Sequence, residues 1–316
     1  MEADRKTRIS GADGLNLKNR WLGVELECLP EFGGRLNYLQ LQSGSLKKNL
    51  LAGFSTVEDL KADPQYTNVL LFPFSNRLQN GIWHYKGEKF QFPQNDDGGR
   101  PNALHGFLFN KPFEIVSTSN DENGVSVELK YCYRADFTYY PFELDVVIRY
   151  RIQKPDTFQF EFLVENLGDV EAPVSFGWHP YFDFGEDVDQ LVLQTPSLRK
   201  IEVDENLIPT GKTLLFNDFR NGKRMHTLQI DNCFYRESEE AIHLTSPEQK
   251  IAVEIQPDEN FPYVHFYIPP HRKQIAIESV TSNINAFQNG DHLRWIDAGN
   301  HLNGKITLTL KSLAAS

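Results

Sequence analysis

Two histidines and one glutamate lie in apolar segments that are far apart in the chain. His179 lies in residues 175–182 (SFGWHPYF), His105 in residues 101–106 (PNALHG) and Glu278 in residues 274–279 (QIAIES). Imidazole titrates close to neutral pH, and burial can raise the pKa of a carboxyl group toward the same range. These side chains therefore suit proton transfer in both directions across one small molecule, provided that the fold brings them together.

Each of these residues also has a purely structural interpretation. A single histidine in an apolar segment is more often a hydrogen-bonded core residue, and Glu278 could be a surface residue of an edge strand. Glu278 is the more informative position, because residues 274–277 (QIAI) predict a buried strand and acidic residues are rarely buried without a partner. A carboxylate at that place must face solvent, pair with a cation or be held for a chemical task.

Two further polar residues follow apolar runs and suit the binding of hydroxyl groups. Arg77 comes after residues 69–74 (VLLFPF), and its planar fork of donors fits vicinal hydroxyls or a carboxylate. Asp231 precedes residues 232–235 (NCFY) and offers two acceptor oxygens. The structural alternatives are a surface ion pair for Arg77 and a turn for the Asp-Asn dipeptide.

Aromatic residues beside these motifs could form flat walls for a sugar ring. Trp178 is the strongest candidate, because it directly precedes His179, and Phe74, Tyr181 and Phe182 are nearby candidates. The chain contains 23 phenylalanines, most of which must fill the core of the fold.

Four segments in this order resemble the aldose 1-epimerase (galactose mutarotase-like) family. They are residues 75–81 (SNRLQNG) with 85–90 (YKGEKF), 102–106 (NALHG), 179–182 (HPYF) and the late acidic residue Glu278. Residues 207–211 (LIPTG) and 231–234 (DNCF) are similar to family landmarks between the last two segments. The resemblance extends from about residue 23 to the C-terminus, and the ordered combination is more specific than any single segment.

The resemblance implies roles for individual residues. Glu278 would be the general base and His179 the general acid, and His105, Arg77 and Asp231 would hold the sugar. The implied reaction interconverts the α and β anomers of a free aldose, so the implied partner is a monosaccharide.

The sequence departs from the galactose-specific members of that family in several places. It has Gly177 and Trp178 where they carry a polar pair, residues 140–142 (YPF) where they carry Tyr-Pro-Gly, and its own surroundings of the base at residues 277–281 (IESVT). These differences leave the proton-transfer groups in place and indicate a divergent subgroup.

Two alternatives stay open at this point. One is a hexose 6-phosphate 1-epimerase, for which Arg35, Arg77, Lys86 and Arg100 could supply phosphate contacts. The other is a carbohydrate-binding protein that keeps the scaffold without catalysis.

Strict alternation of apolar and polar residues predicts the elements that must position these groups. It occurs in residues 125–133, 142–150, 158–164, 263–268 and 306–310. Such runs are typical of half-buried strands, and the close turns between them favour a large antiparallel β-sandwich. The resemblance implies the galactose mutarotase-like supersandwich, in a single domain over residues 1–316.

Two segments stand apart from this pattern. Residues 55–62 (STVEDLKA) predict a short helix, in which Ser55 and Glu58 have the spacing of a capping box. Residues 94–100 (QNDDGGR) predict a solvated turn, with a loop that closes over a ligand as the alternative.

Composition excludes several classes of partner. The formal net charge of −11 disfavours nucleic acid and anionic membrane surfaces. The histidines show no metal-binding spacing, no glycine motif for a nucleotide is present, and we expect neither a metal nor a cofactor. Three separated cysteines, no signal peptide at the N-terminus and no apolar run of about 20 residues predict a cytoplasmic protein.

Overall fold

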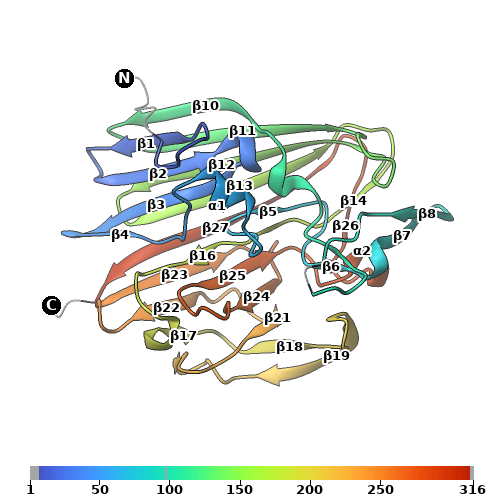
Figure 1. The fold of residues 1–316 in the computed structure, drawn as a ribbon. Coiled ribbons are helices and arrows are strands. Elements are labelled where there is room, and N and C mark those ends of the chain that lie inside the picture. The colour runs from blue at the N-terminus through green and yellow to red at the C-terminus, as the bar shows by residue number, and fades with distance from the viewer. Residues whose placement is uncertain (1–6, 97, 314–316) are drawn as a thin grey trace.

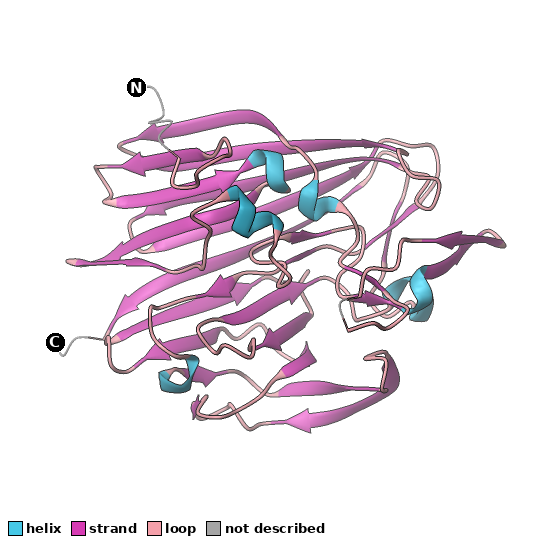
Figure 2. Cartoon of the chain, viewed as in Figure 1, coloured by secondary structure: helices cyan, strands magenta, loops and turns pink. Residues whose placement is uncertain are grey.

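Strands are the main secondary structure of the chain. The computed structural model describes residues 7–96 and 98–313 (Figure 1). Strands dominate the cartoon in Figure 2, and the helices in it are short. Every paired strand in the described residues is antiparallel to its neighbour. The predicted all-β antiparallel sandwich is therefore confirmed.

A nine-stranded sheet forms one side of the sandwich. Its strands, in spatial order, are β10 (Glu114–Asp121), β11 (Gly124–Arg134), β12 (Glu143–Lys154), β13 (Thr157–Asn166), β27 (His301–Ser312), β23 (Ile251–Pro257), β22 (Ile242–Ser246), β17 (Val192–Gln194) and β20 (Lys223–Arg224).

An eight-stranded sheet forms the other side and carries the candidate catalytic groups. Its strands, in spatial order, are β19 (Pro209–Phe216), β18 (Leu198–Val203), β21 (Asp231–Arg236), β24 (Tyr263–Tyr267), β25 (Ile275–Val280), β15 (Gly177–Trp178) and β5 (Leu70–Leu71), and β16 (Tyr181–Phe182) also pairs with β25.

Smaller sheets and short helices complete the described part of the chain. One sheet has four strands: β1 (Leu15–Asn19), β2 (Val24–Leu29), β3 (Arg35–Ser43) and β4 (Leu46–Asn49). The two-stranded sheets are β6 (Arg77–Leu78) with β9 (Ala103–Leu104), β7 (Ile82–Tyr85) with β8 (Glu88–Gln91), and β14 (Ala172–Val174) with β26 (Arg294–Ile296). The helices are α1 (Val57–Lys61) and α2 (Ala286–Asn289), with 3-10 turns at Pro30–Phe32, Gln79–Gly81, Leu108–Asn110 and Val188–Gln190.

The core lies between the two large sheets, and alternation decides which side chains enter it. Val146 and Ile148 of β12 are fully buried there, in line with the alternation expected of residues 142–150. From the opposite sheet, Trp178 stacks on Phe160 of β13 with ring centroids 5.2 Å apart. The main buried cluster includes residues from Leu17 to Leu310, so strands from both ends of the described chain contribute to it.

The predicted helix is present, but its cap lies one residue later than expected. Thr56, not Ser55, is the N-cap of α1, and its side chain accepts a hydrogen bond from the backbone N–H of Asp59. The hydroxyl of Thr56 in turn donates to the carboxylate of Asp59, so Thr56 and Asp59, and not Ser55 and Glu58, are the hydrogen-bonded pair at the start of this helix. Both pairs have the same spacing, and backbone geometry selects between them.

Candidate active site

A cavity of about 240 Å³ lies against the eight-stranded sheet. Glu278, His179, His105, Arg77 and Asp231, which come from five separate segments of the chain, all line it. The other lining residues are Pro64, Gln65, Tyr66, Asn76, Arg100, Leu104, Tyr181, His265 and Tyr267. The sequence therefore identified five residues that the fold does bring to one cavity.

Alternation along β25 turns Glu278 into this cavity. Its neighbour Ile277 belongs to the core cluster on the other face of the sheet. Glu278 is 2% exposed and His179 is 4% exposed, and Oε1 of Glu278 lies 3.3 Å from Nε2 of His179. The ring of His179 is held by stacking on Tyr181, with centroids 5.0 Å apart.

One atom of each partner is left without a hydrogen bond. Oε2 of Glu278 and Nδ1 of His179 are buried and make no hydrogen bond within the described part of the chain. Buried polar atoms normally have partners. Since Glu278 lines the cavity, its unpaired Oε2 is suited to accept a hydrogen bond from a bound molecule.

Burial shifts the two pKa values in opposite directions. It raises the pKa of Glu278 to about 7, although the charge of His265 opposes this shift. Burial and then the charge of His265 lower the pKa of His179 to about 3. The Glu278–His179 pair therefore holds one proton between about pH 3 and pH 7, and the two groups titrate as a unit.

His105 reaches the cavity from a strained turn after β9. Its φ is 63°, and Gly106 follows with a φ of 70°. The backbone N–H of Asn76 donates to Nδ1 of His105 (3.3 Å), which leaves Nε2–H as the ring donor. Burial and then the charge of His179 hold the pKa of His105 well below its ordinary value. His105 is therefore suited to donate a hydrogen bond as a neutral imidazole.

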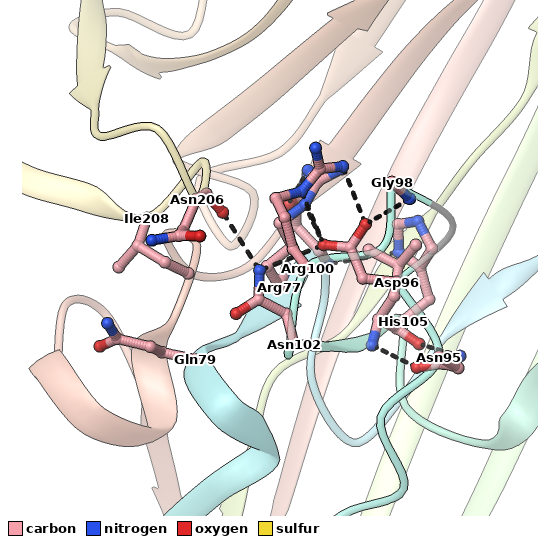
Figure 3. Close-up of polar contacts among 12 residues, drawn as sticks. Arg77, Gln79, Asn95, Asp96, Gly98, Arg100, Asn102, His105, Asn206 and Ile208 are labelled. Carbon is pink, nitrogen blue, oxygen red and sulfur yellow. Dashed lines mark hydrogen bonds and ion pairs between the residues drawn. The ribbon is translucent and has the colours of Figure 1, made fainter.

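Arg77 is fixed by a carboxylate that the sequence did not single out (Figure 3). Asp96, whose side chain is fully buried, accepts from Nε of Arg77 (2.9 Å) and from Nε and Nη2 of Arg100 (3.1 and 2.8 Å). Asn102 and the backbone N–H of Gly98 also donate to Asp96. The expected solvated turn at residues 94–100 is therefore wrong at Asp96, which holds two guanidinium groups at the cavity.

Asp96→Asn is expected to lower the free energy of unfolding by about 3 kcal/mol, because it leaves two guanidinium groups at the cavity without their carboxylate. Urea denaturation checks this value. Asp218→Asn is the matched control, because Asp218 is 59% exposed in its ion pair with Lys223 and such surface pairs contribute about 0–1 kcal/mol. Equal losses in the two variants would contradict a structural role for Asp96.

Asp231 is held by a histidine that was not among the predicted site residues. Oδ1 of Asp231 lies 2.8 Å from Nε2 of His265, and both residues line the cavity. Although burial opposes the shift, the hydrogen bond and charge of His265 hold the pKa of Asp231 below its ordinary value. The alternation of residues 263–268 was visible in the sequence, but which face of that strand carries the site was not.

Trp178 does not line the cavity, so its expected contact with a sugar ring is wrong. Its side chain is fully buried in the inter-sheet core, against Phe158 and Phe160. The physical reason is strand alternation, which sends Trp178 and His179 to opposite faces of the sheet. Of the other aromatic candidates, Tyr181 lines the cavity, whereas Phe74 and Phe182 belong to the core cluster.

Only two of the four cations that were expected to contact a phosphate group lie at the cavity. Arg77 and Arg100 line the cavity. Arg35 is buried elsewhere and donates to the backbone carbonyls of Phe32, Thr67 and Phe109. Lys86 lies in the turn between β7 and β8, with its ammonium 5.0 Å from the ring centroid of Tyr85.

Residues 7–96 and 98–313 contain neither a ready-made metal cluster nor a helix suited to cross a membrane. No cluster of three or more His, Cys, Asp or Glu in these ranges is arranged to hold a metal ion. None of the helices in them combines the length and apolar character needed to span a bilayer.

The chain is similar to known proteins over most of its length. The sequence profile of the family described as aldose 1-epimerase matches residues 23–309. A protein of Escherichia coli strain K12 named Uncharacterized protein YihR is 27% identical over 237 residues, which are 73% of this chain and 74% of that protein.

Solved structures share the architecture at low sequence identity. A galactose mutarotase-like protein from Clostridium acetobutylicum superimposes with a TM-score of 0.86 at 19% identity, over 96% of each chain. Galactose 1-epimerase from Lactobacillus acidophilus NCFM superimposes with a TM-score of 0.80 at 19% identity, over 98% of this chain and 97% of that one. At these identities the likeness shows a common fold.

Proposed function

The chain belongs to the aldose 1-epimerase family, and we propose that it interconverts the α and β anomers of a free aldose by general acid–base ring opening. The observation that carries this proposal is the Glu278–His179 pair, whose nearest atoms are 3.3 Å apart in one cavity. A buried carboxylate beside a buried imidazole suits a reaction that needs a base and an acid at adjacent oxygens.

The reaction uses one proton shared by the pair. Glu278 takes the proton of the C1 hydroxyl while His179 gives a proton to the ring oxygen, and the C1–O5 bond breaks. The open-chain aldehyde rotates about its C1–C2 bond, and the ring closes on the other face with both transfers reversed. Because the pKa of Glu278 lies above that of His179, the shared proton rests on Glu278, and the reaction proceeds from the form in which this proton has moved to His179. His179 then gives up its proton as Glu278 gains one, so the pair keeps one proton and no outside acid or base is consumed.

The surrounding polar groups bind the sugar in this proposal. His105 donates from Nε2 to an oxygen near the ring, and Arg77 donates to a hydroxyl pair. Asp231 accepts from a hydroxyl further round the ring. A neutral His105 next to His179 binds without adding a second charge that would disfavour protonation of His179.

Polarimetry tests the proposal directly. Freshly dissolved α-glucose, α-galactose and other aldoses should lose their initial rotation faster with the protein than without it. Sugar binding without acceleration of mutarotation would instead identify a carbohydrate-binding protein on the same scaffold, and the enzymatic proposal would be abandoned.

The rate is expected to fall as pH rises through about 7. Ring opening needs one proton in the pair, and the pair releases that proton at the pKa of about 7 given for Glu278. Above this value kcat/KM should drop about tenfold per pH unit, measured by polarimetry after subtraction of the uncatalysed rate. A rate that instead rises through pH 7 would mean that only the carboxylate is needed and that His179 is not the acid.

A phosphorylated hexose is the second candidate substrate, because Arg77 and Arg100 both line the cavity. Asp96 already neutralises one of these two positive charges, which favours an uncharged sugar. Turnover of glucose and of glucose 6-phosphate under identical conditions separates the two substrates. A higher kcat/KM for the phosphate ester would replace the free aldose in the proposal.

A further inference from the structure

His265 lies beside two carboxylates of this cavity, those of Asp231 and Glu278. It lies on β24, directly opposite Glu278 of β25 in the strand register, and opposite Cys233 of β21 on the other side. The residue is 5% exposed. Alternation in β24 sends Val264 and Phe266 to the core and leaves His265 on the face of the sheet that carries the site.

Both ring nitrogens of His265 already face protein groups. Nε2 lies 2.8 Å from Oδ1 of Asp231, and Nδ1 lies 3.3 Å from Nδ2 of Asn76. Neither nitrogen is therefore directed at a substrate. His265 can therefore affect the reaction only indirectly, by positioning or changing the charge state of neighbouring residues.

We propose that His265 is a positioning residue that fixes the carboxylate of Asp231 for a sugar hydroxyl and places a positive charge beside Glu278. This inference rests on the proposed function for its catalytic consequences, but the charge and the contact with Asp231 can be measured without any activity.

Two neighbours act on the charge of the His265 ring in opposite directions. Asn76 accepts from the backbone N–H and Nη1 of Arg77 through its Oδ1, so its amide nitrogen faces Nδ1 of His265 and favours a neutral ring. The contact with Asp231 is 0.5 Å shorter and charge-assisted, which favours the imidazolium. Although burial opposes it, the carboxylates of Glu278 and Asp231 raise the pKa of His265 to about 10.

The titratable and charged groups around His265 come from every element packed against it. They are Asp231 and Cys233 of β21, Glu278 of β25, Arg77 of β6, His105 after β9 and His179 after β15. Glu278 and Asp231 are the anionic members of this set. Both adjoin His265, so a positive ring stabilises the ionised form of each.

Two substitutions separate the hydrogen bond from the charge. His265→Gln keeps a donor for Asp231 and removes the charge, so KM should stay within about threefold of the wild type. The fall in kcat/KM near pH 7 should move about one unit higher, because Glu278 holds its proton longer without the positive ring. His265→Leu removes both features and should also raise KM by about 10- to 100-fold, the range for a lost hydrogen bond to a charged group.

His301→Gln is the matched control, since His301 is exposed on β27 of the other large sheet. It should change neither KM nor the pH profile. A merely structural His265 would change stability or KM in its variants without moving the pH at which the rate falls. An unmoved pH profile in His265→Gln would therefore overturn the inference while the proposed function stands.

Nuclear magnetic resonance gives a test that needs no turnover. Protein with 13C-labelled histidine rings, with the His265 signal assigned by its loss in His265→Gln, should show this ring still protonated at pH 8. In Asp231→Asn the same ring should lose its proton at a lower pH. A neutral His265 ring at pH 7 in the wild type would overturn the inference. An inactive wild type with a protonated ring would overturn only the proposed reaction.

Discussion

Glu278→Gln is expected to lower kcat by about two to four powers of ten while sugar binding persists. The amide has the size of the carboxylate and keeps a hydrogen-bonding group at the cavity, but it cannot take the proton of the C1 hydroxyl. Polarimetry gives the rate, and calorimetric titration with the aldose gives the affinity. A variant that turns over at the wild-type rate would remove Glu278 from the mechanism.

The same substitution is expected to stabilise the protein at alkaline pH. The folded-state pKa of Glu278 is about 7, above its ordinary value of 4.5, so the native protein binds a proton that the unfolded chain releases between these values. Wild-type stability therefore falls as pH rises from about 4.5 to 7, and the burial of the charged form is fully penalised above 7. At pH 8 Glu278→Gln should exceed the wild type by about 1–3 kcal/mol in urea unfolding.

Glu248→Gln is the control for both measurements, because Glu248 is exposed in the turn between β22 and β23. Neither its turnover nor its stability should depart from the wild type. Gain of stability together with loss of turnover in the Glu278 variant alone would indicate a residue kept for chemistry at the expense of the fold.

His179→Gln is expected to lower kcat by a similar two to four powers of ten, because the ring oxygen loses its proton donor. Its residual rate should also change its response to pH. With Glu278 left as the sole titrating member of the pair, the rate should rise as pH increases through the pKa of Glu278, the reverse of the wild-type behaviour. Rates at pH 5 to 9, corrected for the uncatalysed reaction, check this reversal.

The double variant Glu278→Gln with His179→Gln should be little slower than either single variant, because groups that act as a unit are not additive. His84→Gln, which changes an exposed histidine of β7, is the control and should behave as the wild type. A full-rate His179→Gln would mean that the acid is another group of the cavity.

Local patterns predicted the strands well, because alternation expresses burial directly. Val264 and Phe266 enter the core as the pattern indicates. The pattern does not show which strand lies next to β24. The place of His265 in the site depends on the register that sets it opposite Glu278. A contact between residues that belong to different strands has no local signal in a single sequence.

The errors in the site have the same origin. Asp96 lies in a segment whose composition is that of a solvated turn, yet its partner Arg77 is 19 residues earlier in the chain. The adjacency of Trp178 and His179 in sequence predicts that both lie at the cavity, but the period of a strand places such neighbours on opposite faces. That period therefore separates Trp178 from the cavity that His179 lines.

The left-handed backbone at His105 limits how position 105 can be altered in the laboratory. β-branched residues such as valine and isoleucine disfavour that conformation, whereas asparagine and glycine tolerate it. The next position is more restricted, because any side chain at Gly106 would place its first carbon 2.0 Å from the carbonyl oxygen of Phe72. Directed evolution toward a new sugar should therefore retain Gly106, accept few replacements at position 105, and find most of its useful variants along other walls of the cavity.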